Sequence, residues 1–163
     1  YGKGVLHNGS HMVDWIRLLL GDIAEVEPLG PPIFDFSPTD PTMGARLVLQ
    51  RGGQVLLQPV DSRALTVFEL DLVFERARVR LLDSGFIVER SPVGPDTRFA
   101  GYRCLQAAQR EASGLGQALT AMADNLAAHL GDGTPLACTA DDALAAMRIP
   151  LRLIERAGPT PYA

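Results

Sequence analysis

Apolar side chains near the start of the chain recur at the spacing of an amphipathic helix. They are Val13, Ile16, Leu19 and Leu20. Residues three and four apart share one side of a helix. Ser10 is a suitable N-terminal cap and Gly21 a suitable stop. The pattern predicts a helix over residues 10–20, preceded by a glycine-rich segment.

The middle of the chain alternates apolar and polar residues with the period of β-strands. The alternating stretches are residues 23–27, 45–50, 55–60, 68–74, 76–81 and 86–89. The turn over residues 51–54 predicts an antiparallel hairpin. Residues 28–41, which contain five prolines, and residues 91–101 are predicted to be loops. Residues 104–112 fit either a short helix or a strand.

Two amphipathic helices are predicted to close the chain. The first has an apolar stripe of Leu119, Met122, Leu126 and Leu130. The second follows Thr139–Asp142, which resembles a capping box, and Pro150 is expected to kink it. One helix, about six mostly antiparallel strands and two helices predict an α+β fold with helices packed on one face of a sheet. A chain of 163 residues fits a single domain.

Composition narrows the class of partner and the location. The formal net charge of −4 argues against nucleic acid, whose binders carry a basic face. The apolar runs are far shorter than the roughly 20 residues that span a bilayer, so no membrane partner is expected. Cys104 and Cys138 lie far apart without metal-ligand spacing, which favours a reduced, cytoplasmic chain.

The residues best suited to chemistry lie where the glycine-rich segment meets the first helix. His11, at the start of that helix, suits proton transfer near neutral pH, although a histidine there can also simply cap or pack. His7 and His11 are spaced like a metal pair, but the Glu of an HExxH motif is absent and no metal is expected. Ser10 lacks the glycine-flanked elbow of a hydrolase. Asn8 can donate to and accept from a sugar hydroxyl.

Basic residues are less informative than these histidines. Arg76, Arg78 and Arg80 occupy alternate positions of a predicted strand, where a solvated or subunit-facing surface is more typical than an anion site. Lys3 is the only lysine in the chain. It is therefore the one candidate for a lysine that contacts substrate.

A longer stretch around the histidines resembles a known family. It comprises Gly4-Val5-Leu6, Gly9-Ser10-His11-Met12-Val13-Asp14 and Leu18-Leu19-Leu20-Gly21. This stretch is similar to the opening of the C-terminal domain in the glucose-fructose oxidoreductase, inositol dehydrogenase and MocA family. The predicted hairpin and the ending Cys138–Leu144 with its final helix follow in similar order, so the resemblance covers nearly the whole chain.

The resemblance implies a function for these residues. In the family, a Rossmann domain precedes this one and supplies the glycine-rich dinucleotide loop and a catalytic lysine in a Glu-Lys-Pro context. The chain has neither, so we expect that domain upstream and expect residues 1–163 alone to bind neither NAD nor NADP. His11 matches the family's proton-transferring histidine, and His7 falls where the family has an aspartate.

The resulting hypothesis is the substrate-facing half of an NAD(P)-dependent oxidoreductase acting on a sugar-like hydroxyl. His11 and His7 are the expected catalytic residues, and Asn8 and Lys3 the expected substrate-binding residues. The alternative is a non-catalytic α+β binding or oligomerisation domain. The upstream sequence separates the two, because a strand–GxGxxG–helix unit there favours the enzyme.

The predicted strands also lead to a prediction about assembly. Val67 and Val73 alternate with Glu69 and Asp71, so the second face of the sheet is not plainly hydrophilic. The resemblance implies pairing through this face, and we expect a homodimer that buries sheet against sheet. Sedimentation at concentrations on the order of tens of micromolar checks this, and a monomer alone under those conditions would contradict it.

Overall fold

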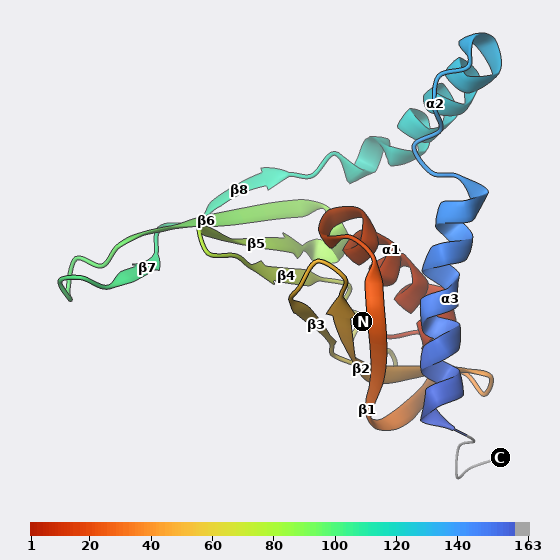
Figure 1. The fold of residues 1–163 in the computed structure, drawn as a ribbon, viewed down its shortest axis with the longest axis horizontal. Coiled ribbons are helices and arrows are strands. Elements are labelled where there is room, and N and C mark those ends of the chain that lie inside the picture. The colour runs from red at the N-terminus through yellow and green to blue at the C-terminus, as the bar shows by residue number, and fades with distance from the viewer. Residues whose placement is uncertain (159–163) are drawn as a thin grey trace. The chain divides into compact units, whose positions relative to one another are not determined.

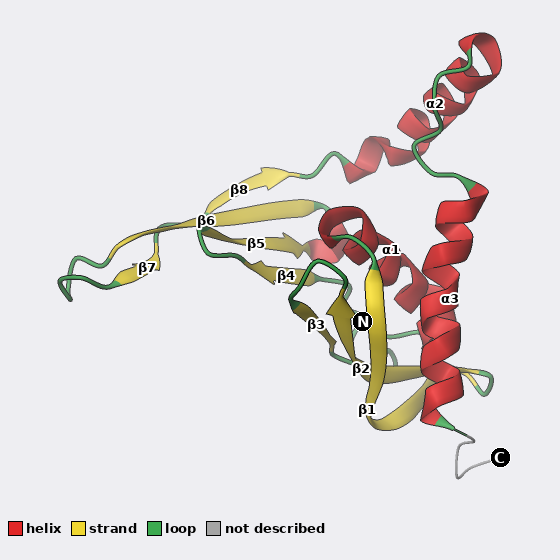
Figure 2. Cartoon of the chain, viewed as in Figure 1, coloured by secondary structure: helices red, strands yellow, loops and turns green. Residues whose placement is uncertain are grey.

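The protein folds as two compact units, each built on an antiparallel sheet (Figure 1). A computed structural model describes residues 1–158. Unit 1 comprises Tyr1–Val67 and Cys138–Ala163, and unit 2 comprises Phe68–Ala137. Helices and strands occur in both units (Figure 2), which confirms the predicted α+β class. That the whole chain acts as one domain stays a prediction.

The sheet of unit 1 has three antiparallel strands in the order β1-β2-β3. They are β1 (Ile23–Ser37), β2 (Asp40–Leu49) and β3 (Gln54–Leu57). The predicted hairpin is confirmed, with Leu47 opposite Val55 on β3. Leu47 is also opposite Val26 on β1, and both side chains are fully buried. The other face of the sheet carries the exposed ion pair between Arg46 and Glu27.

The prediction of a loop over residues 28–41 is wrong for most of that stretch. β1 continues to Ser37, with Leu29 opposite Gly44 and Ile33 opposite Thr42. The prolines fit because β1 is an edge strand, where an N–H that points away from the sheet is not needed for pairing. Shifts in register on either side of Ile33 absorb the remaining irregularity.

Helices cover the buried face of the unit 1 sheet. They are α1 (Gly9–Leu20), which follows a π-helical turn over Gly4–Asn8, and α3 (Ala140–Ala157). Ile16 of α1 and Leu153 of α3 are buried in this core. Because the π-helical turn runs directly into α1, the helical segment begins at Gly4 and not at Ser10, where the sequence predicted its start. α3 runs through Pro150 without interruption, and that proline is buried.

Guanidinium groups attach α3 to its neighbours within unit 1. Arg156 donates to the carbonyl of Val26 and Arg152 to that of Ala24, both on β1. Arg17 of α1 donates to the carbonyl of Asp142 at 2.9 Å, in the first turn of α3. These three arginines thus connect α3 to β1 and α1, which lie more than a hundred residues earlier in the chain.

Unit 2 contains a five-stranded antiparallel sheet and one long helix. Its elements are β4 (Leu70–Val73), β5 (Ala77–Leu82), β6 (Ile87–Pro95), β7 (Arg103–Leu105), β8 (Gln109–Ala112) and α2 (Ala118–Asp132). The order is β4-β5-β6-β7, and β8 also pairs with β6. β6 extends into the predicted loop at residues 91–101. The stretch 104–112 forms strands rather than a helix.

One face of the unit 2 sheet carries an ion-pair ladder. Arg78 pairs with Asp71 across β5 and β4, and Arg80 and Arg110 both pair with Glu89 on β6. The hydrogen bonds from Arg80 and Arg110 hold the pKa of Glu89 below its usual range. Two of the three alternating arginines, Arg78 and Arg80, are thus engaged by carboxylates of their own sheet.

No helix among residues 1–158 is both long and apolar enough to cross a membrane.

The side chains of α2 are largely exposed, including Leu119 and Leu130. Val73, on β4, is 78% exposed. The predicted homodimer stays a prediction.

The predicted capping box at the start of α3 is confirmed and leads to a test of stability. Thr139 Oγ1 accepts the N–H of Asp142, and the Asp142 carboxylate accepts the N–H of Thr139 at 2.9 Å. We expect Thr139→Ala to lower the free energy of unfolding by about 0.5–2 kcal/mol. Urea titration measures the loss. Thr97→Ala, at an exposed position, is the control and should change the midpoint little. Equal midpoints for both variants would contradict this role.

Candidate functional site

The helical segment that carries the candidate residues is held by a buried carboxylate from the sheet. Asp40, at the start of β2, is 7% exposed and accepts the N–H of Leu6 at 2.7 Å and of His7 at 3.0 Å. The first N–H groups of a helix lack partners within it, and a carboxylate there also favours the helix dipole. Gly4 has φ of 80°, and a Cβ at this position would overlap the Asp40 carboxylate. Glycine is therefore required at position 4.

A second carboxylate holds the residues just before that turn. Asp35 of β1 accepts the N–H of Lys3 at 3.0 Å, the N–H of Ser62 at 2.8 Å and the hydroxyl of Thr42 at 2.5 Å. Thr42 in turn accepts the N–H of Gly4 at 2.8 Å. Burial alone would raise the pKa of Asp35, but these hydrogen bonds outweigh it and hold that pKa well below its ordinary value. Asp35 is therefore ionised at neutral pH.

These contacts determine whether the glycine-rich segment at the start of the chain can bind a phosphate group. A dinucleotide loop binds pyrophosphate with free backbone N–H groups at a helix N-terminus. Here the N–H groups of Lys3, Gly4, Leu6 and His7 are already donated to Asp35, Thr42 and Asp40. The described residues of this segment therefore do not fit the pyrophosphate of NAD or NADP.

The two candidate catalytic histidines lie on successive turns of one helical segment. His7 belongs to the π-helical turn Gly4–Asn8, and His11 lies in the first turn of α1. Residues four apart on a helix are neighbours on its surface. Both side chains are exposed, and within residues 1–158 no hydrogen bond reaches either imidazole ring. Both rings are therefore accessible for proton transfer.

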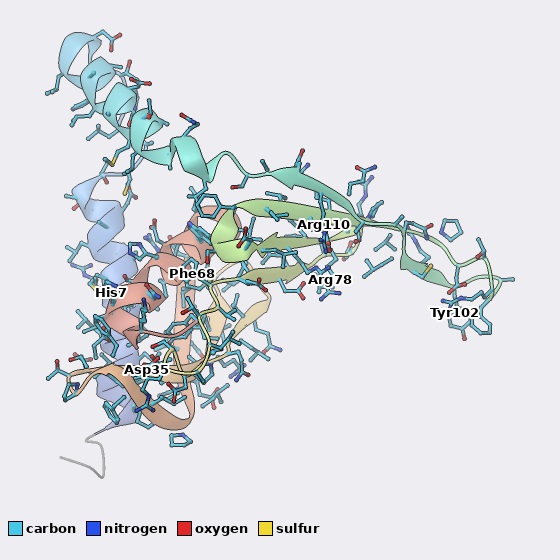
Figure 3. All side chains as sticks on the ribbon, turned by 180° about the vertical axis from the view of Figure 1, so that it is seen from behind. His7, Asp35, Phe68, Arg78, Tyr102 and Arg110 are labelled. Carbon is cyan, nitrogen blue, oxygen red and sulfur yellow. The ribbon has the colours of Figure 1, made fainter. Side chains whose placement is uncertain are left out.

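The ring of His7 is held by an aromatic neighbour. It stacks on Phe36 of β1, with 4.8 Å between ring centroids and 15° between ring planes. Figure 3 shows His7 on the N-terminal helical segment and Asp35, which directly precedes Phe36, on β1. The end of β1 thus contacts both the backbone before His7 and its side chain.

The other candidate residues have less defined surroundings. Asn8, half-buried, precedes α1, and its side chain makes no capping hydrogen bond. Lys3 is exposed and adopts φ of 62°, with its backbone fixed by Asp35. Ser10 donates its hydroxyl to the carbonyl of His7 at 2.7 Å rather than to an imidazole, which does not match a hydrolase arrangement. Among residues 1–158 no three His, Cys, Asp or Glu side chains are grouped as a metal site requires.

Tyr1 lies close to this segment without being a candidate for proton transfer. Its hydroxyl donates to the carbonyl of Met43 at 2.8 Å, and the side chain is buried. Burial raises the pKa of Tyr1 to about 12. The phenol therefore stays protonated at neutral pH, and its role is to hold the segment against β2.

Sequence reasoning missed the residues that support the site, namely Asp35, Phe36, Asp40 and Thr42. They fall in or beside the stretch that proline content assigned to a loop. Each contacts a partner about thirty or more residues earlier. The signal available in the sequence was the pair of aspartates flanking a short turn at Pro38-Thr39, which is consistent with a β-turn.

Comparison with known proteins gives a consistent result for the fold. No protein-family model matches the chain, and no curated protein sequence does. Biliverdin reductase from Synechocystis, solved with biliverdin and NADP+, is 12% identical with a TM-score of 0.59, over 91% of this chain and 44% of that one. UDP-N-acetylglucosamine 3-dehydrogenase from Acidithiobacillus ferrooxidans is 15% identical with a TM-score of 0.56, over 90% and 45%.

A third solved structure agrees with these two. An oxidoreductase from Agrobacterium radiobacter, in complex with NAD+, L-tartaric acid and magnesium, is 17% identical with a TM-score of 0.61, over 91% of this chain and 45% of that one. The chain thus shares its fold with part of each of these three oxidoreductases. This agrees with the fold that the sequence resemblance implies. The chain spans a little under half the length of each of these three proteins.

The Asp35 cluster leads to a pH-dependent prediction. A carboxylate with a depressed pKa in the folded state stabilises fully above its unfolded pKa of about 3.9, and this contribution is lost as the pH falls toward the folded pKa. We expect Asp35→Asn to cost about 2 kcal/mol at pH 7, the typical value of hydrogen bonds to a charged group. The difference from wild type should shrink below about pH 4.

Urea titrations at pH 7 and at pH 3 measure this difference. Asp124→Asn, on the exposed surface of α2, is the matched control and should leave the midpoint unchanged at both values. A destabilisation by Asp35→Asn of the same size at both values would show that its charge is not involved.

Proposed function

We propose that this chain is the substrate-facing part of an NAD(P)-dependent oxidoreductase that acts on a sugar-like hydroxyl. The observation that carries the proposal is the pair of exposed histidines, His7 and His11, on successive turns of a segment fixed by Asp35 and Asp40. A fold likeness alone would not suffice, because one fold supports many activities. The proposal joins the fold of an oxidoreductase domain to a site able to move a proton.

The dinucleotide is proposed to be held by a Rossmann domain elsewhere in the whole protein. The similar solved proteins are each more than twice as long as the region that this chain covers. The N–H groups of Lys3, Gly4, Leu6 and His7 are engaged by side chains of the protein itself and are not free to bind a phosphate. The bound dinucleotide would supply the hydride chemistry.

His11 is proposed to exchange a proton with the substrate hydroxyl. Oxidation of an alcohol to a carbonyl removes one proton from oxygen, and a neutral imidazole nitrogen can accept it. In the reverse direction the imidazolium returns that proton. The exposed position of His11, free of hydrogen bonds from the described residues, leaves both ring nitrogens available.

Asn8 and Lys3 are proposed to bind and orient the substrate, and His7 to orient or share the proton. His7 is near His11 along the helix surface and can share the proton or orient its neighbour. The Asn8 amide can donate to one hydroxyl and accept from another. The exposed Lys3 ammonium offers further donors to substrate oxygens.

A non-catalytic interaction domain is the second candidate. The observation that favours it is the apolar stripe of α2, whose large side chains are all exposed. They are Leu119, Met122, Leu126 and Leu130. Exposed apolar stripes of this kind are typical of surfaces that bind another protein. An upstream sequence without a dinucleotide loop would support this candidate.

Replacement of His11 tests the proposed function in the intact protein. We expect His11→Ala to lower kcat for a sugar alcohol by about a hundred- to ten-thousand-fold, because the general acid and base is lost. Cofactor affinity should stay nearly unchanged. His7→Ala should cost less, since water can partly replace an orienting group. Steady-state kinetics with NAD or NADP reduction followed by absorbance measure both effects.

His129→Ala is the control for these variants. His129 is the third histidine of the chain, is exposed, and lies on α2 in unit 2. The His129→Ala substitution should leave kcat unchanged. A folded His11→Ala enzyme with full turnover would falsify the assignment of His11.

A further inference from the structure

The ring of His7 is constrained independently of its backbone. Asp40 binds its N–H at 3.0 Å, and Phe36 stacks on its imidazole with ring planes 15° apart. These two contacts come from different strands, β1 and β2. A side chain fixed only through its backbone would still rotate about its own side-chain bonds. The stack is the contact that limits this rotation.

Phe36 is not a residue of the hydrophobic core. Its side chain is 52% exposed. Its preceding residue, Asp35, is fixed by three hydrogen bonds from Lys3, Ser62 and Thr42. The Phe36 ring therefore extends from a part of β1 that hydrogen bonds hold in place. It stacks on the side chain of His7, a candidate catalytic residue.

We propose that Phe36 is a positioning residue that holds the His7 imidazole in the orientation from which it acts with His11. This inference rests on the proposed function. The imidazole of His7 can turn about its two side-chain bonds, and the Phe36 ring stacked against it restricts that rotation. Positioning of this kind raises rate because small displacements of a reacting group are costly.

An ordinary surface contact between two rings would have a different consequence. It would add to stability and leave the rate per folded molecule unchanged. The proposal instead requires that removal of the Phe36 ring lowers kcat and leaves KM nearly unchanged, since the orientation of His7 matters when the proton moves. It also requires that any residue with a similar flat ring substitutes for phenylalanine.

Three variants of the intact protein separate these cases. Phe36→Leu removes the ring and keeps the apolar volume, and Phe36→Tyr keeps the ring. Phe86→Leu is the matched control, because Phe86 is 50% exposed and lies in unit 2. Phe36→Leu should lower kcat by about three- to tenfold, the rate equivalent of one aromatic pair. Phe36→Tyr and Phe86→Leu should retain the wild-type value.

Proton NMR of the His7 ring provides a readout that needs no activity. A stacked aromatic ring shifts the imidazole protons upfield, so Phe36→Leu should move them downfield toward the values of an unstacked histidine, whereas Phe36→Tyr should not. His7→Ala assigns the signals. Unchanged ring-proton positions in Phe36→Leu would show that the stack does not hold His7 in solution and would overturn the proposal.

The kinetic outcomes distinguish this proposal from the proposed function. If His11→Ala abolishes turnover while Phe36→Leu keeps wild-type kcat, the positioning role is wrong and the oxidoreductase assignment stands. If His11→Ala keeps full turnover, the proton-transfer role of His11 is wrong, and the positioning role of Phe36 in that transfer is wrong with it. An equal loss in Phe36→Leu and Phe36→Tyr would also contradict the role of the ring. A loss in Phe86→Leu as large as that in Phe36→Leu would contradict its specificity.

Discussion

The arrangement of unit 1 depends on two carboxylates of the β1–β2 hairpin that accept backbone N–H groups from the start of the chain. Asp35 binds Lys3, and Asp40 binds Leu6 and His7. Burying a carboxylate is costly unless hydrogen bonds replace its water. Here the carboxylates and the unsatisfied N–H groups of a helix start satisfy one another. The candidate residues therefore gain their positions only when the hairpin is formed, so the sheet and the site are coupled.

The same contacts separate this segment from a phosphate-binding loop, although both combine glycines with a helix start. In a dinucleotide loop the anion comes from the ligand, and the N–H groups remain free until it binds. In this chain the anion is Asp40, a residue of the protein itself. Gly4 is needed because the Asp40 carboxylate approaches its backbone closely. Glycine content alone thus says little about phosphate, and the partners of the N–H groups are the informative observation.

Features with local causes could be predicted from the sequence, and features with distant causes could not. The Thr139–Asp142 capping box and the β2–β3 hairpin depend on residues within a few positions, and both were predicted correctly. The continuation of β1 through its prolines depends on its place at the sheet edge, which local composition does not reveal. His7 and His11 stood out by residue type, whereas the contacts of Phe36 and Asp40 with the helical segment depend on the fold and could not be predicted from the sequence.

The fold of this chain says less about the substrate than the side chains of the candidate site do. Proteins with this fold include one solved with biliverdin and one that is a UDP-N-acetylglucosamine dehydrogenase, at 12% and 15% identity to this chain. The scaffold therefore does not select the substrate, and side chains at the site must do so. At this site an imidazole stands where the family resemblance expects an aspartate, and an aromatic ring supports it. The stacked rings of His7 and Phe36 give this part of the segment a flat, partly apolar surface, which a hydrogen-bonding side chain alone would not provide.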